Sequence, residues 1–170
     1  MTLYQLGERE NGLLLQINNA AGLIEEKLKK LEEEGVFEAY KQVHSQYAAL
    51  AQENSEALKR GLFLQWYALV EPPFLSGIND IDPQAETRLI DTLDDKISQD
   101  EVEPELYAMV SYYADWEFVF DRFAGCDNLQ RLISGRLSYN RIIHQLKQSN
   151  LTTRGQMGIY WQSIISLVGK

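Results

Sequence analysis

Apolar residues recur at intervals of three and four along most of the chain, and this spacing constrains the fold more than any other feature of the sequence. Residues at these intervals lie on one face of an α-helix, whereas a half-buried strand needs alternation of apolar and polar residues, which is nearly absent. The clearest run in the first third of the chain consists of Leu13, Ile17, Ala20, Ile24, Leu28 and Leu31. The sequence therefore predicts an all-α protein.

Residues that break or cap helices divide this pattern into six or seven predicted helices. Gly35 is the one evident break within residues 13–52, so this stretch is predicted to form an antiparallel helical hairpin. The next helix begins near Ser55, ends at Pro72-Pro73 and is apolar almost all round from Gly61 onward, which predicts a place at the centre of the bundle. The remaining predicted helices begin at Asp82-Pro83, Pro104, Asp127 and Thr152 or Thr153, and they end near Ser98, Gly125, Gln148 and Leu167.

The length and composition of the chain are those of one folded domain. Of its 170 residues, 45% are apolar and 24% are charged, values that exclude a disordered protein. We expect a compact single domain over residues 1–170, with residues 1–12 as an irregular N-terminal arm. No apolar run approaches the roughly 20 residues needed to cross a bilayer, so no membrane contact is expected. The single cysteine, Cys126, excludes an internal disulfide and predicts a soluble, cytoplasmic protein.

The net charge of −9 argues against binding to nucleic acid or to an anionic membrane, since phosphate binding needs clustered Lys and Arg. The charge is unevenly distributed. Residues 80–103 hold nine acidic and two basic residues, whereas residues 122–154 hold six basic residues and one acidic residue. Several interpretations stay open: the segments are solvated helix faces, they pair within one molecule or between two copies, or the acidic segment imitates the phosphate backbone of a nucleic acid.

A search for catalytic and metal-binding patterns finds none. The chain has no glycine-rich phosphate loop and no Gly-x-Ser-x-Gly nucleophile turn. Its two histidines, His44 and His144, follow Lys41 and Arg141 by three residues, which does not fit the Glu-x-x-His pairs of helical di-iron proteins. We therefore expect no catalytic residue, no metal and no cofactor.

Charged residues on apolar helix faces form the one candidate polar site. Glu117, Arg136 and Arg154 lie within the apolar arcs of the last three predicted helices. A buried unpaired charge is costly, so residues of opposite sign on inward faces are expected to meet. Arg60 and Glu71, on the predicted central helix, are candidates for the same group. The group is either a closed network of buried ion pairs or a pocket in which Arg136 and Arg154 hold an anionic or aromatic ligand.

Two surfaces are candidates for contact with a partner. Asp91, Asp94 and Asp95 lie on the acidic segment, and Phe74 and Leu75 follow a double proline that forces an extended exit from the central helix. These observations predict a non-catalytic protein that acts by binding another protein or a second copy of itself. A small-ligand or enzymatic pocket among the C-terminal helices is the main alternative, and an acidic mimic of nucleic acid is a further one.

Overall fold

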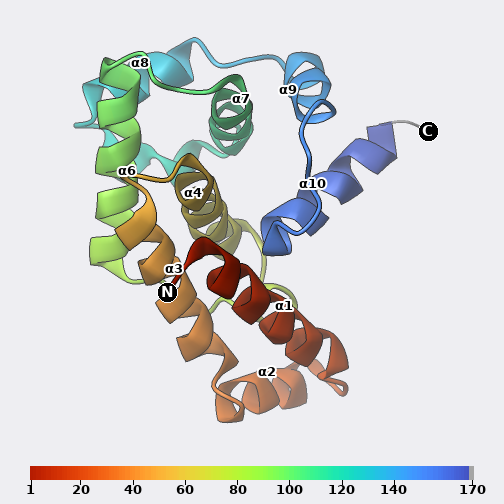
Figure 1. The fold of residues 1–170 in the computed structure, drawn as a ribbon. Helices are drawn as coiled ribbons and strands as arrows, with labels where there is room; N and C mark the ends of the chain where they lie inside the picture. The colour runs from red at the N-terminus through yellow and green to blue at the C-terminus, as the bar shows by residue number, and fades with distance from the viewer. Residues whose placement is uncertain (169–170) are drawn as a thin grey trace.

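The computed structural model describes residues 1–168 and contains, over that range, ten α-helices, two 3₁₀ segments and no strand (Figure 1). The α-helices are α1 (Leu3–Asn19), α2 (Ile24–Glu33), α3 (Val36–Leu50), α4 (Ser55–Val70), α5 (Pro73–Ser76), α6 (Pro83–Ser98), α7 (Pro104–Tyr113), α8 (Asp127–Ser134), α9 (Tyr139–Leu146) and α10 (Gly155–Val168). The 3₁₀ segments, η1 (Glu117–Val119) and η2 (Asp121–Phe123), follow α7. The prediction of an all-α protein is confirmed. None of these helices is both long and apolar enough to cross a membrane.

The N-terminal residues form a helix, and the predicted irregular arm over residues 1–12 is wrong. α1 begins at Leu3, where the hydroxyl of Thr2 accepts the backbone N–H of Gln5 at 3.2 Å and the Gln5 side chain accepts that of Thr2 at 2.9 Å. This reciprocal pair satisfies donors that a helix start otherwise leaves without partners. Leu6 is buried where α1 packs against the body of the protein. Two apolar residues facing the core, Leu3 and Leu6, are too few to reveal a helical pattern in the sequence.

Three helices, rather than a two-helix hairpin, account for residues 13–52. A break at residues 20–23 separates α1 from α2, and Gly22 within it has a φ of +112°, which a residue with a side chain rarely adopts. Gly35, the predicted break, lies between α2 and α3 with a φ of +72°. The sequence pattern does not reveal the earlier break, because the apolar residues from Leu13 to Leu31 keep their spacing of three and four on both sides of the turn.

α4 lies among α3, α5, α6, α7 and α10, and every one of its residues from Ala57 to Trp66 is buried. Its aromatic side chains pack with those of α7 and α10. Trp66 stacks on Tyr113 with ring centroids 4.8 Å apart, and the centroid of Phe63 lies 5.6 Å from that of Tyr160. This aromatic cluster also contains the other two tryptophans of the chain, so tryptophan fluorescence reports on the packing of these helices.

α4 and α6 approach closely at Gly61. A Cβ atom at this position would lie 2.7 Å from Cδ2 and 2.9 Å from Cδ1 of the buried Leu89. We expect Gly61→Ala to lower the free energy of unfolding by about 1–2 kcal/mol, because overpacking outweighs the gain in helix propensity. Gly12→Ala is the matched control, since a Cβ at Gly12 meets nothing within 4 Å. Urea denaturation followed by tryptophan fluorescence measures both, and a Gly61→Ala variant as stable as Gly12→Ala would contradict the close contact.

The C-terminal third consists of shorter helices than the sequence pattern predicts. The helix predicted over residues 104–125 ends at Tyr113, and the chain continues in the two 3₁₀ segments. The single helix predicted over residues 127–148 is two helices, α8 and α9. Both differences matter for the candidate site, because they change which side chains face inward.

Contacts with α7 hold the connection between α8 and α9, residues 135–138. Tyr107 donates its hydroxyl to the carbonyl of Gly135, and the hydroxyl of Ser111 accepts the N–H of Leu137 at 3.1 Å. These bonds satisfy backbone groups that a continuous helix would have satisfied itself. The break is therefore stabilised by a neighbouring helix.

Candidate functional site

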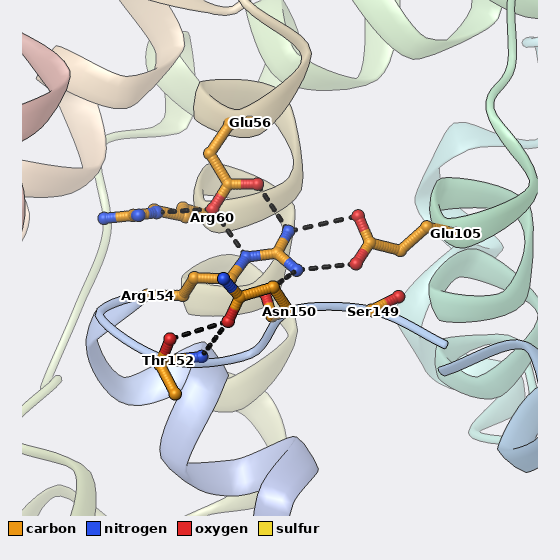
Figure 2. Close-up of a pocket in the computed structure, with 7 residues that line it drawn as sticks. All are labelled: Glu56, Arg60, Glu105, Ser149, Asn150, Thr152 and Arg154. Atoms are coloured by element: carbon orange, nitrogen blue, oxygen red, sulfur yellow. Dashed lines mark hydrogen bonds and ion pairs between the residues drawn. The ribbon is translucent and has the colours of Figure 1, made fainter. Parts of the chain in front are cut away.

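The guanidinium of Arg154 lies between two glutamates, as Figure 2 shows. Arg154 directly precedes α10, and its side chain is 8% exposed. Nε donates to Glu56 Oε1 at 2.7 Å, and Nη1 donates to Glu105 Oε1 at 2.6 Å. Nη2 donates to both carboxylates, and Nη1 also donates to the carbonyl of Asn150 at 3.4 Å. All five N–H groups of the guanidinium therefore have acceptors.

The same two carboxylates bind two cations of α4. Arg60 Nε donates to Glu56 Oε1 at 2.8 Å, and Lys59 Nζ donates to Glu105 Oε2 at 2.6 Å. Lys59 also binds Glu103, at 2.5 Å. Cations and carboxylates thus alternate in equal numbers in one set of contacts, and their charges balance. We call this set the Arg154 network; its members are Lys59, Arg60, Arg154, Glu56, Glu103 and Glu105.

Local sequence places several members of the Arg154 network. The side chain of Asn54 accepts a backbone N–H of the first turn of α4 at 3.0 Å and caps this helix. Glu56 and Arg60 follow four residues apart, on one face of α4. Pro104 is the first residue of α7, so Glu105 lies in the first turn, where the helix dipole favours a carboxylate. Helix starts therefore bring two of the three carboxylates to the site.

The loop before α10 is held in an uncommon conformation. Thr153 has a φ of +60°, in the left-handed region that β-branched residues rarely adopt. Its carbonyl accepts a hydrogen bond from Arg60 Nη2 at 3.2 Å, and the next residue, Arg154, is fixed by its ion pairs. Such a conformation persists only where surrounding contacts impose it. The Arg154 network thus anchors the start of α10.

The buried carboxyl group of Glu10, on α1, makes a second attachment to α10. It accepts the hydroxyl of Tyr47 at 2.6 Å and the backbone N–H of Gln156 at 3.1 Å. Burial raises the pKa of Glu10, and these hydrogen bonds offset only part of that rise. Gly155 provides the space, since a Cβ there would lie 2.5 Å from the carboxyl carbon of Glu10. α1 and α3 therefore hold the first turn of α10 at a second point, in addition to the ion pairs of Arg154.

Electrostatics keeps the Arg154 network charged near neutral pH. Burial alone would raise the pKa of Glu105, but hydrogen bonds from Arg154 and Lys59 outweigh it and lower the pKa to about 2. Burial likewise disfavours the charged form of Arg154, yet its bonds to Glu56 and Glu105 raise the pKa of the guanidinium. General acid–base catalysis needs a group whose pKa lies near the working pH, and neither Glu105 nor Arg154 meets that requirement.

A shallow depression of about 510 Å³, open to solvent, lies over the Arg154 network. Ser149, Asn150 and Thr152 complete its lining, as Figure 2 shows. The carbonyl of Asn150 accepts from Arg154, and its side chain accepts the N–H of Thr152 at 3.1 Å. These polar groups are engaged with one another, so the depression presents paired charges to solvent.

Two of the five residues predicted to form a polar group come together in the structure. Arg60 and Arg154 share the carboxylate of Glu56. Glu117 is exposed on η1, and Arg136, also exposed, pairs with a different residue, Asp115, at 3.3 Å. The expected grouping of Glu117 with Arg154 does not form.

The ends of the helices explain this separation. Because α7 ends at Tyr113, Glu117 does not lie on the inward face that a longer helix would give it. Glu117 and Arg136 line a separate depression of about 250 Å³. Glu71 follows the last residue of α4, roughly 16 Å along the helix axis from Arg60 at 1.5 Å per residue. None of the three lies in the Arg154 network.

Five charged residues of the Arg154 network and of the Glu10 attachment were not among the predicted site residues; they are Glu10, Glu56, Lys59, Glu103 and Glu105. Glu56 carries a signal in the sequence, because Arg60 follows it at the spacing of a helical ion pair. Lys59 and Glu105 carry none, since their contact joins segments 46 residues apart. Glu10 is equally hidden, because its partner Gln156 lies 146 residues away.

Most acidic residues of the segment 80–103 have partners within the molecule. Asp94 caps α8, because it accepts the N–H of Leu129 at 2.7 Å and the side-chain amide of Asn128 at 3.0 Å. Glu86 is buried and binds Arg122. These contacts join the acidic segment to the basic segment 122–154 inside one molecule. Four more acidic residues have partners elsewhere in the molecule or within the acidic segment itself; they are Asp80, Asp82, Glu101 and Glu103.

The other residues predicted to contact a partner lie at the surface to different degrees. Asp91 and Asp95 are exposed on α6. Leu75 is exposed on the short helix α5, whereas Phe74 beside it is half-buried. The double proline thus leads into one turn of helix, not into an extended segment, and a single large apolar side chain there reaches solvent.

The chain's histidine and cysteine side chains do not join the site. Burial lowers the pKa of His44 to about 4, and burial raises the pKa of the half-buried Cys126 thiol. Within residues 1–168, no three or more His, Cys, Asp or Glu side chains are grouped so as to hold a metal ion. Comparison with protein-family models, curated proteins and solved structures finds no match to this chain.

Proposed function

We propose that the protein is non-catalytic and acts in the cytoplasm by binding another protein through the outer half of α10. This helix carries no charged residue over its 14 residues. Its first turns pack against α1, α4 and α9, whereas its last turns extend beyond the neighbouring helices (Figure 1). A charge-free helix that projects into water is typical of a surface that a partner covers.

The exposure of one face of α10 increases toward its C-terminal end. Trp161 is fully buried, and Ile164 and Ile165, one turn later, are half-buried. Val168, on the same face, is 43% exposed, and the neighbouring Leu167 is 65% exposed. The face that belongs to the core at the start of the helix therefore continues past the core. This continuation is the observation that carries the proposal.

The acidic segment 80–103 is a weaker candidate for the contact surface. Six of its nine acidic residues bind or cap groups within the chain, four of them outside the segment, which leaves Asp91, Asp95 and Asp100 for a partner. A mimic of nucleic acid needs a continuous row of unpaired charges. The partners of these acidic residues thus support a structural role for most of this segment.

The geometry of Arg154 supports the non-catalytic part of the proposal. An enzyme or ligand site centred on Arg154 would need N–H donors that are available to a substrate, and every N–H of Arg154 already has an acceptor in the chain. The network instead fixes the loop from which α10 extends. A rigid base for a projecting helix is what an interaction surface requires.

Site-specific photo-crosslinking in the native cell tests this proposal. A crosslinking residue at Leu167 or Val168 is expected to trap one discrete partner, whereas the same residue at Asp91 or Asp95 is expected to trap none. Leu167→Glu is then expected to abolish recovery of that partner without lowering the melting temperature, since this side chain is mostly exposed. The Asp95→Lys variant, on the exposed face of α6, is the matched control and is expected to retain the partner.

Three outcomes would contradict the proposal. Trapping at Asp91 or Asp95 alone would place the contact surface on the acidic segment. Absence of any trapped protein at Leu167 and Val168 would remove the support for an interaction role of α10. A crosslinked product containing two copies of this chain would show self-association in place of a different partner, and light scattering at about 50 mM and about 500 mM salt would then show whether that association is electrostatic.

A further inference from the structure

A second depression, of about 330 Å³, shares Arg60 with the depression over the Arg154 network. Residues of the first turns of α1 and Thr153 complete its lining. Its volume is at the lower end of the range for small-molecule pockets, so it suits a small ligand. This depression is distinct from the surface of α10 that the proposed function uses.

The floor of this depression contains unused hydrogen-bond donors of Arg60. The side chain is 7% exposed, and it donates from Nε to Glu56 at 2.8 Å, from Nη1 to the hydroxyl of Tyr47 at 3.4 Å, and from Nη2 to the carbonyl of Thr153 at 3.2 Å. Each terminal nitrogen of a guanidinium carries two N–H groups, so one on each has no acceptor among the described residues. Figure 2 shows these two nitrogens pointing away from Glu56 and Arg154.

Gly7 on α1 leaves these donors accessible. A Cβ atom at Gly7 would lie 3.2 Å from Nη1 of Arg60, so any larger residue would cover this nitrogen. Gly7 lies in the interior of α1, where glycine costs about 1 kcal/mol relative to alanine. The cost of a glycine at this position is therefore explained by the space that it leaves open over Arg60.

The chemistry of the rim complements that of the floor. Paired N–H groups of a guanidinium bind a carboxylate better than any other acceptor in small metabolites except phosphate. Glu8, exposed on the rim, adds a carboxylate whose contact within the chain is a weak one with Asn11 at 3.4 Å. The apolar side chains of Leu3 and Tyr4 lie beside it. A ligand with a carboxylate, an ammonium group and an apolar group could therefore bind Arg60, Glu8 and the side chains of Leu3 and Tyr4 respectively.

We propose that this depression binds a free α-amino acid with an apolar side chain. Its carboxylate binds the two free N–H groups of Arg60, its ammonium group binds Glu8, and its side chain packs on Leu3 and Tyr4. A phosphate ester would place its charges against Glu8 without compensation, which is why an amino acid fits better. The proposal does not depend on a protein partner for α10.

Calorimetric titration of the full chain with L-phenylalanine tests the proposal. We expect saturable binding that weakens by at least about tenfold for 3-phenylpropionate, which lacks the ammonium group, and for 2-phenylethylamine, which lacks the carboxylate. Gly7→Ala is expected to weaken binding of L-phenylalanine by about tenfold, because the new methyl group covers Nη1. Gly12→Ala, on the same helix with open space around it, is the matched control and is expected to leave binding unchanged.

The variant Glu8→Gln separates the two charged contacts without touching the Arg154 network. It is expected to weaken binding of L-phenylalanine but not that of 3-phenylpropionate, which has no ammonium group for Glu8 to bind. Absence of saturable binding of L-phenylalanine at millimolar concentration would overturn the proposal. So would equal binding to the Gly7→Ala and Gly12→Ala variants, or binding of 3-phenylpropionate as tight as that of the amino acid. Melting temperatures of the three variants show that each is folded at the temperature of the titration.

Discussion

Replacing Arg154 by methionine is expected to lower the free energy of unfolding by about 3–5 kcal/mol, the cost of removing one partner from a buried ion pair. The substitution leaves Glu56 and Glu105 without the cation that bridges them. Arg60 and Lys59 each compensate one of these carboxylates only in part, because each binds it from a single side. Methionine keeps most of the apolar stem, so the loss reports on charge pairing more than on packing.

Arg136→Met is the matched control for this prediction. Arg136 also pairs with a carboxylate, that of Asp115, but the two side chains are 45% and 49% exposed. An exposed pair of this kind contributes about 0–1 kcal/mol. Urea denaturation followed by tryptophan fluorescence measures both variants. If Arg154→Met costs no more than Arg136→Met, the Arg154 network does not anchor α10 in the way the geometry indicates.

Lowering the pH from 7 to 4.5 is expected to cost about 2–3 kcal/mol of stability through His44 alone. This side chain is fully buried on α3, and neither ring nitrogen has a hydrogen-bond partner within residues 1–168. Burial lowers the pKa of His44 to about 4, below its ordinary value of 6.5. As the pH falls through 6.5, the unfolded chain binds a proton that the folded chain does not accept. The stability that neutral His44 confers is therefore complete above pH 6.5 and is lost as the pH approaches 4.

The variant His44→Leu isolates this effect. We expect the change in unfolding free energy between pH 7 and pH 4.5 to be smaller in this variant than in the natural chain by about 2–3 kcal/mol. His144→Leu, which removes an exposed histidine, is the control and should keep the steeper dependence. Denaturation curves of the three chains at both pH values provide the six free energies. Equal pH dependence in His44→Leu and in the natural chain would contradict the burial of a neutral imidazole.

Other titratable groups also make stability depend on pH, but their contributions are the same in the natural chain and in His44→Leu and cancel when the two are compared. The pKa of Glu105 is lowered to about 2, so its contribution is lost between about pH 4.5 and 2, below the range of the test. The pKa of Glu10 is raised, so its contribution is present at low pH and is lost as the pH rises through the folded pKa. Asp82, the charged group near His44, remains in both chains. The difference between the two chains therefore reports on His44.

Helix content could be predicted because it depends on residues close together in the sequence. The break at Gly35 and the cap at Asp82 each act over a few residues, and each is found in the structure. Helix ends were less predictable. α7 ends at Tyr113 and the α8–α9 connection forms where Ser111 and Tyr107 bind the chain from a neighbouring helix. No local residue pattern specifies such contacts.

In the candidate site, too, local sequence predicted some features and contacts between distant segments determined the others. The apolar surroundings of Arg154 indicated that its charge would be buried, and the cost of an unpaired buried charge required a carboxylate partner. The expected partner was Glu117, but the structure supplies Glu56 and Glu105. The choice depends on how α4, α7 and the loop before α10 lie in space. A pattern in the sequence does not specify how far apart such segments lie in the folded protein.

By itself the sequence determined that this chain is helical, that its central helix is apolar on nearly every side, and that Arg154 needs a partner, since spacing, caps and the cost of burying charge are local properties. Only the tertiary structure decided which carboxylates Arg154 binds, that Gly7 opens above Arg60, and that the apolar face of α10 continues past the core. These features arise where segments distant in the sequence meet, and their positions follow from the packing of the whole chain.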